Sequence, residues 1–214
     1  LYKTIMSSFW NKYYKRKKTT HSPTNFAIYC KNHFLKKNKK LLEIGCGNGR
    51  DSFYFVKQNI FVTAVDKSRE AIKANNFKNK KKEIKFLNRD INNKNFSKIG
   101  KFDYIYSRFF LHTINQESET KLFNNLSKLG LPNKTIILFE FRTIKDPLYK
   151  IGKKISKYER FTDHYRRFID NNILKRCLLK KNKFKILKVL EKKGLAKHKK
   201  EDPVVCRLIL KFIK

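Results

Sequence analysis

Short apolar runs alternate with stretches of helical periodicity along the middle of the chain. The runs have the length of strands and are rich in β-branched and aromatic residues, and they lie at residues 40–44, 61–65, 84–87, 104–106 and 135–141. Between them, apolar residues recur at the spacing of one helix face. Strands that alternate with helices form parallel sheets whose two faces are covered by those helices. The pattern therefore predicts an α/β fold.

The helices between these strands have recognisable ends. We expect the first at residues 51–58, and Ser68 stands where it can cap the second, which carries Ala71 and Ile72. A later helix has leucines at positions 122, 126 and 129 and ends at Gly130. These signals agree with helices that connect successive parallel strands.

The last part of the chain follows a different pattern. A helix around residues 173–178 precedes two long strand patterns, at 184–190 and 204–212, with only a charged loop between them. Two strands joined without a helix form an antiparallel hairpin. We therefore expect a Rossmann-like, doubly wound sheet of seven strands, mostly parallel and ending in an antiparallel hairpin. Residues 142–170 form a longer aromatic and basic segment.

The first 38 residues stand apart from the alternating pattern. Trp10, Tyr13 and Tyr14 cluster, and Thr24 is placed to cap an amphipathic helix. We expect residues 1–38 to form a helical, aromatic lid segment and residues 39–214 to form the main domain. In the alternative interpretation the helix after Thr24 simply covers the edge of the sheet. Met6 is a natural start, so residues 1–5 would be an upstream extension.

The net charge of +36 attracts attention because cationic surfaces bind nucleic acids and anionic membranes. Most of this charge comes from lysines spread along the whole chain, which is typical of compositional drift. A nucleic-acid site would instead be a local basic stripe with aromatic residues. Residues 12–18 and 80–82 come closest to one. The charge by itself selects neither interpretation.

Other features narrow the setting. The chain has no apolar run of roughly 18 residues, which a membrane-spanning helix needs, and Lys and Tyr interrupt residues 1–20, where a signal peptide would lie. The four cysteines form no C-x-x-C pair. We expect a cytoplasmic protein without a metal site or a disulfide framework, and no membrane partner.

One loop is more informative than the rest of the sequence. Residues 41–51 form an apolar strand that contains Glu43 and continues through Gly45, Gly47 and Gly49 into a helix. Glycine at such positions lets a ligand approach the backbone closely. The spacing G-x-G-x-G differs from the G-x-G-x-x-G of the dinucleotide fingerprint. The alternative is a glycine-rich turn of an ordinary Rossmann-like protein.

This loop resembles motif I of the class I S-adenosylmethionine (SAM)-dependent methyltransferases. Asp66 ends the second strand, where a carboxylate can accept from both ribose hydroxyls, and Asp90 follows the third strand, where the family places an acid against the adenine. Residues 102–107 are similar to the family's segment beside the methionine moiety. The resemblance covers residues 38–141 and implies SAM as cofactor, held by Glu43, Gly45, Cys46, Gly47, Asn48, Gly49, Arg50, Asp66, Lys67, Asp90, Ile91 and Ser107.

The N-terminal aromatic cluster and the amino-acid sequence of residues 45–52 further resemble those of the tellurite-resistance and thiopurine-type small-molecule methyltransferases. In these an N-terminal aromatic segment closes over cofactor and substrate, which implies such a role for Tyr13 or Trp10. The chain lacks the D/N/S-P-P-Y/F/W segment of amino methyltransferases and the Pro-Cys nucleophile of cytosine methyltransferases. Both absences argue against methylation of a nucleic-acid base.

Arginines and histidines are the candidates for the acceptor side. Guanidinium groups bind oxyanions bidentately, so we expect Arg108, Arg142 and Arg166 to converge on an anionic acceptor. The alternative for them is ordinary surface ion pairs. His112 and His164 are candidate bases because imidazole titrates near neutral pH, although a lone histidine is more often structural.

Three functions fit these residues. The first is transfer of a methyl group from SAM to a small-molecule acceptor that is anionic or a soft nucleophile. The second is an RNA methyltransferase that uses the lysine-rich surface, and the third is a non-catalytic binding module that keeps the fold. The intact glycine loop together with Asp66 argues against the third.

Overall fold

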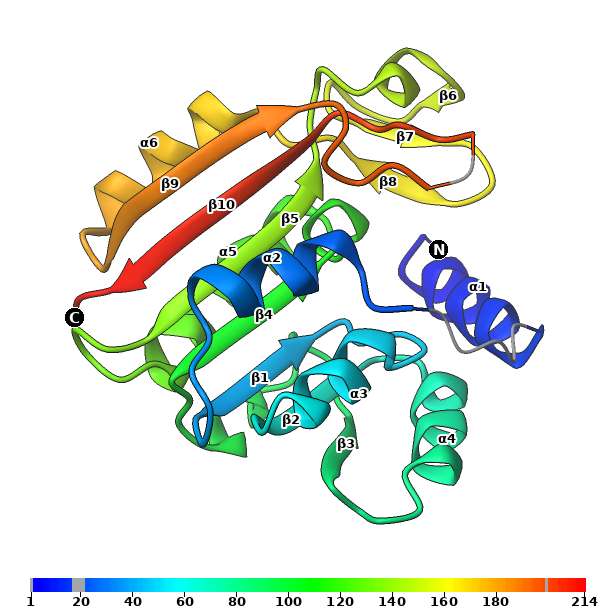
Figure 1. Ribbon diagram of the computed structural model, residues 1–214. Helices are drawn as coiled ribbons and strands as arrows, with labels where there is room; N and C mark the ends of the chain where they lie inside the picture. Colours follow the sequence, from blue (N-terminus) through cyan, green and yellow to red (C-terminus); the bar gives the residue numbers. More distant parts are fainter. Residues whose placement is uncertain (1, 17–21, 199) are drawn as a thin grey trace.

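The computed structural model describes residues 2–16, 22–198 and 200–214. Its centre is a seven-stranded sheet with the order β3-β2-β1-β4-β5-β10-β9 (Figure 1). The first five strands in this order run parallel, whereas β10 is antiparallel to both of its neighbours. The predicted α/β sheet with a C-terminal antiparallel hairpin is thereby confirmed. The strands are β1 (Lys40–Ile44), β2 (Phe61–Asp66), β3 (Ile84–Asn88), β4 (Tyr104–Arg108), β5 (Ile136–Arg142), β9 (Phe184–Lys192) and β10 (Val205–Phe212).

Six α-helices and three short 3-10 helices accompany the strands in the described part of the chain. The predicted boundaries differ from the observed ones by only one or two residues at most ends. Ser68 and Thr24 act as the predicted N-caps, since each side-chain oxygen accepts from the backbone N–H three residues later. The helices are α1 (Tyr2–Arg16), α2 (Asn25–His33), α3 (Arg50–Lys57), α4 (Arg69–Lys78), η1 (Phe96–Ile99), η2 (Leu111–Thr113), α5 (Gln116–Leu129), η3 (Pro147–Lys150) and α6 (Asn171–Lys181).

The two faces of the sheet carry separate hydrophobic cores. On one face Leu122, Leu126 and Leu129 of α5 pack with the apolar residues of α6 and the sheet. On the other face Phe26 of α2 and Phe55 of α3 belong to a second cluster with strand residues. Because side chains of a strand alternate between faces, the strands are buried on both sides and read as continuous apolar runs.

The aromatic and basic segment at residues 142–170 forms a second, three-stranded antiparallel sheet of β6 (Lys153–Lys154), β7 (Glu159–Phe161) and β8 (Tyr165–Arg167). In Figure 1 it lies beyond the end of β5, near α1. Arg167 attaches this sheet to α5 because its guanidinium pairs with the buried Glu119 of α5 and also donates to the Ile114 carbonyl at 2.9 Å. Periodicity did not predict this sheet, whose strands have only two or three residues.

The two helices of the N-terminal segment lie in different surroundings. Phe26, Ala27 and Cys30 of α2 are fully buried in one core of the sheet. Helix α1 instead contacts α4 and lies beside the three-stranded sheet (Figure 1). Residues 1 and 17–21 lie outside the described residues, so the lid segment at 1–38 and its boundary at 38 stay a prediction. No helix in the described ranges is long and apolar enough to cross a membrane.

Candidate active site

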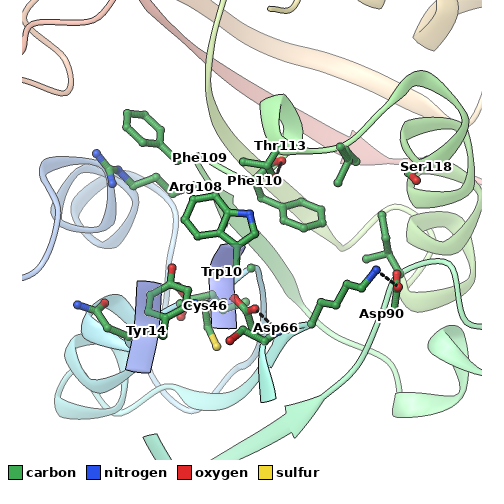
Figure 2. Close-up of a pocket in the computed structure, with 18 of the residues that line it drawn as sticks. Trp10, Tyr14, Cys46, Asp66, Asp90, Arg108, Phe109, Phe110, Thr113 and Ser118 are labelled. Carbon is green, nitrogen blue, oxygen red and sulfur yellow. Dashed lines mark hydrogen bonds and ion pairs between the residues drawn. The ribbon is translucent and has the colours of Figure 1, made fainter. Parts of the chain in front are cut away.

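A cavity of about 450 Å³ lies at the carboxyl ends of β1, β2 and β4 (Figure 2). This is the edge where open α/β sheets bind their ligands. Its volume is in the range of small-molecule sites. Most of the predicted cofactor residues line it: Glu43, Gly45, Cys46, Gly47, Asn48, Arg50, Asp66, Lys67, Asp90 and Ile91.

The glycine loop forms one wall of the cavity, and its backbone requires glycine. Gly45, Gly47 and Gly49 have φ angles of +75°, +51° and +74°, in the region that side chains disfavour. A Cβ on Gly47 would overlap the hydroxyl of Tyr14, and one on Gly45 would lie 2.7 Å from a ring carbon of Phe110. Aromatic side chains and any ligand can therefore reach the loop only because these Cβ atoms are missing.

Asp66 stands at the end of β2 beside this loop. Its Oδ2 accepts from the Gly47 N–H at 2.9 Å and its Oδ1 from the Ser68 N–H at 2.8 Å. Burial raises the pKa of Asp66, and these backbone bonds oppose the shift. A carboxylate has about four acceptor positions, so each oxygen can still accept a hydroxyl from a ligand. This arrangement fits the ribose-binding role that the sequence predicts.

Lys67 and Asp90 connect the ends of β2 and β3. The Lys67 Nζ lies 2.9 Å from Oδ2 of Asp90, and Oδ1 of Asp90 accepts from the Asn92 N–H at 2.9 Å. Burial alone would raise the pKa of Asp90, but the bonds from Asn92 and Lys67 outweigh it and lower that pKa. Asp90 is therefore held as a carboxylate at the end of the cavity that Figure 2 shows opposite to Arg108.

Two predicted cofactor residues support the loop without lining the cavity. Gly49 precedes α3 and packs against the side chain of Asn75, and Ser107 is buried, donating to the Ile44 carbonyl at 2.9 Å. Ser107 thereby joins β4 to the end of β1. Gly49 and Ser107 lie behind the residues that line the cavity, so their contact with the cofactor stays a prediction.

Asn75 of α4 binds the glycine loop through a hydrogen bond that the sequence analysis did not predict. Its Nδ2 donates to the Gly47 carbonyl at 2.8 Å, and its side chain is fully buried. A weak signal was present, since position 75 follows Ala71 and Ile72 at the spacing of one helix face. An asparagine on the buried face of a helix that ends beside a glycine loop indicates a bond to that loop.

We expect Asn75→Ala to destabilise the fold by about 1–3 kcal/mol, because the buried Gly47 carbonyl loses its donor. Urea unfolding followed by circular dichroism measures this. Asn76→Ala is the matched control, since Asn76 is exposed on the same helix. Equal stability of the two variants would show that Asn75 does not hold the loop.

A buried polar network anchors the residues before α2 to the cavity floor. Asp51 accepts from the Thr24 N–H and hydroxyl, each at 2.8 Å, and from the Tyr106 hydroxyl at 2.7 Å. Beside it, the Ser52 hydroxyl donates to Glu43, and burial and the nearby Asp51 raise the pKa of Glu43. Glu43 is thus bound within the fold by Ser52 while it also lines the cavity.

Aromatic side chains form the rest of the wall. Trp10, Tyr13 and Tyr14 of α1 line the cavity on one side, and Phe109 and Phe110 line it after β4. Figure 2 shows the Trp10 indole between the glycine-loop residues and the Phe109–Phe110 turn. Tyr14, which the sequence analysis placed in the cluster without a site role, is the residue that covers Gly47.

The three predicted arginines do not converge. Only Arg108 lines the cavity, where its Nε donates to Glu140 at 2.9 Å. Arg142 is buried and pairs with Asp146 at 3.0 Å and Glu201 at 2.9 Å, whereas Arg166 pairs with Asp163 at 2.7 Å. Carboxylates pair with all three guanidinium groups, and two of the three arginines lie outside the cavity wall, so the structure does not support the expected joint anion pocket.

The two predicted bases also lie outside the cavity wall. His112 is buried in η2, and its Nδ1 accepts from the Arg142 N–H at 3.2 Å, which attaches η2 to the end of β5. His164 stacks on Phe9, with 4.8 Å between ring centroids, and its Nδ1 lies 3.0 Å from Oδ2 of Asp163. His164 thus joins α1 to the three-stranded sheet. Catalysis by either histidine stays a prediction.

We expect His112 to make the fold less stable below neutral pH. Burial, with Arg142 and further nearby charges, lowers the pKa of His112, so the unfolded chain binds a proton more readily than the folded one. The stability from the neutral ring is present above the ordinary pKa of about 6.5 and is lost as the pH falls below it. His112→Asn keeps an acceptor for the Arg142 N–H and cannot titrate.

Thermal unfolding between pH 7 and pH 5 tests this. The melting temperature of the wild type should fall more steeply with decreasing pH than that of His112→Asn. His164, whose pKa is also lowered, is present in both proteins and therefore contributes to both curves. Parallel curves would contradict the assignment.

Comparison with known proteins identifies the family. The sequence matches the family model described as "Methyltransferase domain" over residues 35–195. The chain belongs to this family. The match confirms the class I SAM-dependent methyltransferase that the glycine loop and the strand-end acids predicted, with SAM as its cofactor. No curated protein matches the sequence significantly.

Solved methyltransferases share the fold of this methyltransferase at low sequence identity. A SAM-dependent methyltransferase from Methanosarcina mazei superimposes with a TM-score of 0.70 at 14% identity, covering 85% of this chain and 96% of that one. The glycopeptide N-methyltransferase MtfA, crystallised with S-adenosylhomocysteine, gives 0.68 at 13% identity and covers 92% of each chain. TehB from Haemophilus influenzae gives 0.63 at 20% identity, covering 92% of this chain and 65% of TehB.

Proposed function

We propose that the protein transfers a methyl group from SAM to a small-molecule acceptor that carries an anionic group. One observation carries this proposal: a single cavity of about 450 Å³ has the glycine loop at one side and an aromatic wall with Arg108 at the other. Helix α1 contributes Trp10, Tyr13 and Tyr14 to that wall. A cavity closed by a helix suits a small acceptor better than a polymer.

Each part of the cavity has a role in this reaction. The glycine loop and Asp66 bind and orient the cofactor, whose sulfonium supplies the methyl group. The faces of Trp10 and Phe110 exclude water and attract a cation through their ring electrons. Methyl transfer depends mainly on alignment of nucleophile, methyl carbon and sulfur. No histidine of the described residues lines the cavity, so we favour an acceptor atom that needs no protein base, such as a soft nucleophile.

The RNA methyltransferase is the alternative, because exposed lysines surround the site. Lys12 and Lys15 on α1 are exposed next to the aromatic residues of the cavity wall. Residues 17 and 18 of the basic segment at 12–18 lie outside the described residues. An RNA acceptor would bind this surface with its backbone, and only the nucleotide to be methylated would enter the cavity.

Transfer of labelled methyl from SAM into a cell lysate separates the two. We expect label in the fraction that passes a small-pore filter, unchanged after nuclease treatment. Label that stays above the filter and disappears with ribonuclease would support the RNA acceptor and overturn the proposal. Gly47→Val serves as the inactive control in both fractions.

We also propose a cytoplasmic location. Cys30, Cys46 and Cys206 are buried as free thiols, and Cys177 is an exposed free thiol. Free thiols are typical of proteins in reducing compartments. Labelling of the protein with a thiol reagent after gentle lysis, compared with the reduced protein, would reveal any oxidised fraction.

A further inference from the structure

A second cavity, of about 320 Å³, adjoins the first. Residues 22–25 form one side of it and residues 196–198 form another, while Arg50 and Arg108 line both cavities. Among the described residues that line the second cavity are Arg50, Arg108, Lys197 and His198, and none of these lining residues is acidic. It is therefore a cationic recess beside the methyl-transfer cavity.

The carboxylate nearest to Arg108 does not cancel its charge. Glu140 is buried and receives Arg108 Nε on one oxygen and Arg207 Nε on the other, each at 2.9 Å. Two guanidinium groups against one carboxylate leave a net positive charge. In the described part of the chain, the two Nη groups of Arg108 donate no hydrogen bond, so the outer edge of its fork is available to a ligand. Figure 2 shows this side chain directed away from Asp90 and Ser118.

Arg50 is the second arginine at the junction. It begins α3, and its side chain has no hydrogen bond or ion pair within the described residues. The carboxylate next to it in sequence, Asp51, is turned into the fold, where Thr24 and Tyr106 donate to both of its oxygens. The charge of Arg50 is therefore available at the boundary between the two cavities.

We propose that this recess, defined by Arg50, Arg108, Lys197 and His198, binds the oxyanion of the acceptor, a carboxylate or a phosphate. This inference rests on the proposed function and deepens it. The two arginines lie between the cofactor cavity and the recess, so an acceptor would reach the methyl group with one end while its oxyanion lies against their guanidinium groups. Guanidinium forks match the geometry of both oxyanions, whereas a diffuse lysine surface attracts any anion without such selection.

Direct titration with simple oxyanions tests the recess. Sodium phosphate and sodium benzoate are titrated separately by calorimetry into the protein saturated with S-adenosylhomocysteine, with sodium chloride holding the ionic strength constant. We expect one of the two to bind at a single site, and the tighter anion identifies the class of oxyanion. Failure of both to bind the wild type would overturn the proposal.

Matched variants separate the recess from the general charge. Lys197→Glu should weaken binding of the tighter anion by about fivefold or more, because it removes a cation and adds a repelling charge. Lys193→Glu makes the same change of charge at an exposed position of the same loop outside the recess, and we expect it to retain wild-type affinity. Equal weakening in both variants would show non-specific attraction and overturn the proposal.

Arg108→Lys tests the fork itself. It keeps the charge beside Glu140 and removes the bidentate edge, so anion binding should again weaken by about fivefold or more. An unchanged anion affinity in Arg108→Lys would show that Arg108 does not bind the oxyanion and would contradict the proposed site. SAM affinity is measured on the same protein preparations before S-adenosylhomocysteine is added. If the wild type binds SAM but its anion binding does not respond to these variants, only this inference fails. If the wild type does not bind SAM, the proposed function fails.

Discussion

Gly47→Val should abolish SAM binding while the protein stays folded. The φ of +51° at this position is disfavoured for any side chain and most of all for a β-branched one, and the new Cβ would overlap the Tyr14 hydroxyl. Either the loop or α1 must then move, and the cofactor wall changes shape. We expect calorimetry with SAM to give no measurable binding, with the circular dichroism spectrum unchanged.

Gly194→Val is the control for backbone strain alone. Gly194 has a φ of +79° in the loop between β9 and β10, and a Cβ there would meet no atom within 4 Å. Each variant should lose about 1–3 kcal/mol of stability from strain. Only the change at Gly47 should affect SAM. Wild-type affinity in Gly47→Val would show that the cofactor does not contact this loop.

Asp66→Ala should have the second largest effect, weakening SAM by about 1.5–3 kcal/mol, or about 10- to 150-fold in the dissociation constant. In the proposed site, the interaction lost would be a charge-assisted hydrogen bond from a ribose hydroxyl to the partly buried Asp66 carboxylate. The substitution also removes the acceptor of the Gly47 and Ser68 N–H groups, so the glycine loop is held less firmly and SAM affinity falls further. Calorimetry at constant pH gives the affinity, and turnover at saturating SAM should change less.

Asp103→Ala provides the comparison. Asp103 also accepts a backbone N–H, from Lys40 at 2.9 Å, and it lies outside the cavity wall. Its replacement should cost some stability and leave SAM affinity unchanged. If the two variants bound SAM alike, the ribose site would have to be assigned elsewhere.

Local patterns predicted the main sheet and the cofactor side of the cavity. Each of these patterns involves only residues within about ten positions of one another. They are the apolar runs, the Ser68 and Thr24 caps and the spacing of the glycines. The order of strands follows from the alternation of strand and helix. Asp66 and Asp90 could be placed because the carboxyl ends of parallel strands lie at one edge of the sheet.

The acceptor side depended on contacts between distant parts of the chain. Arg142 is bound by Glu201, and Glu140 is shared by Arg108 and Arg207, pairs that sequence spacing does not reveal. The three-stranded sheet was missed for a similar reason, since its very short strands are held by tertiary contacts such as that of Arg167 with Glu119. Tyr14 and Asn75 lie at the glycine loop only because α1 and α4 pack there.

Trp10 offers the most direct measurement of the central claim, that this cavity binds SAM beneath α1. It is the one tryptophan in the sequence and it lines the cavity. A titration of SAM followed by tryptophan fluorescence should therefore show a saturable change with one site per chain. The same titration of Gly47→Val should be flat. A flat titration of the wild type would contradict the account.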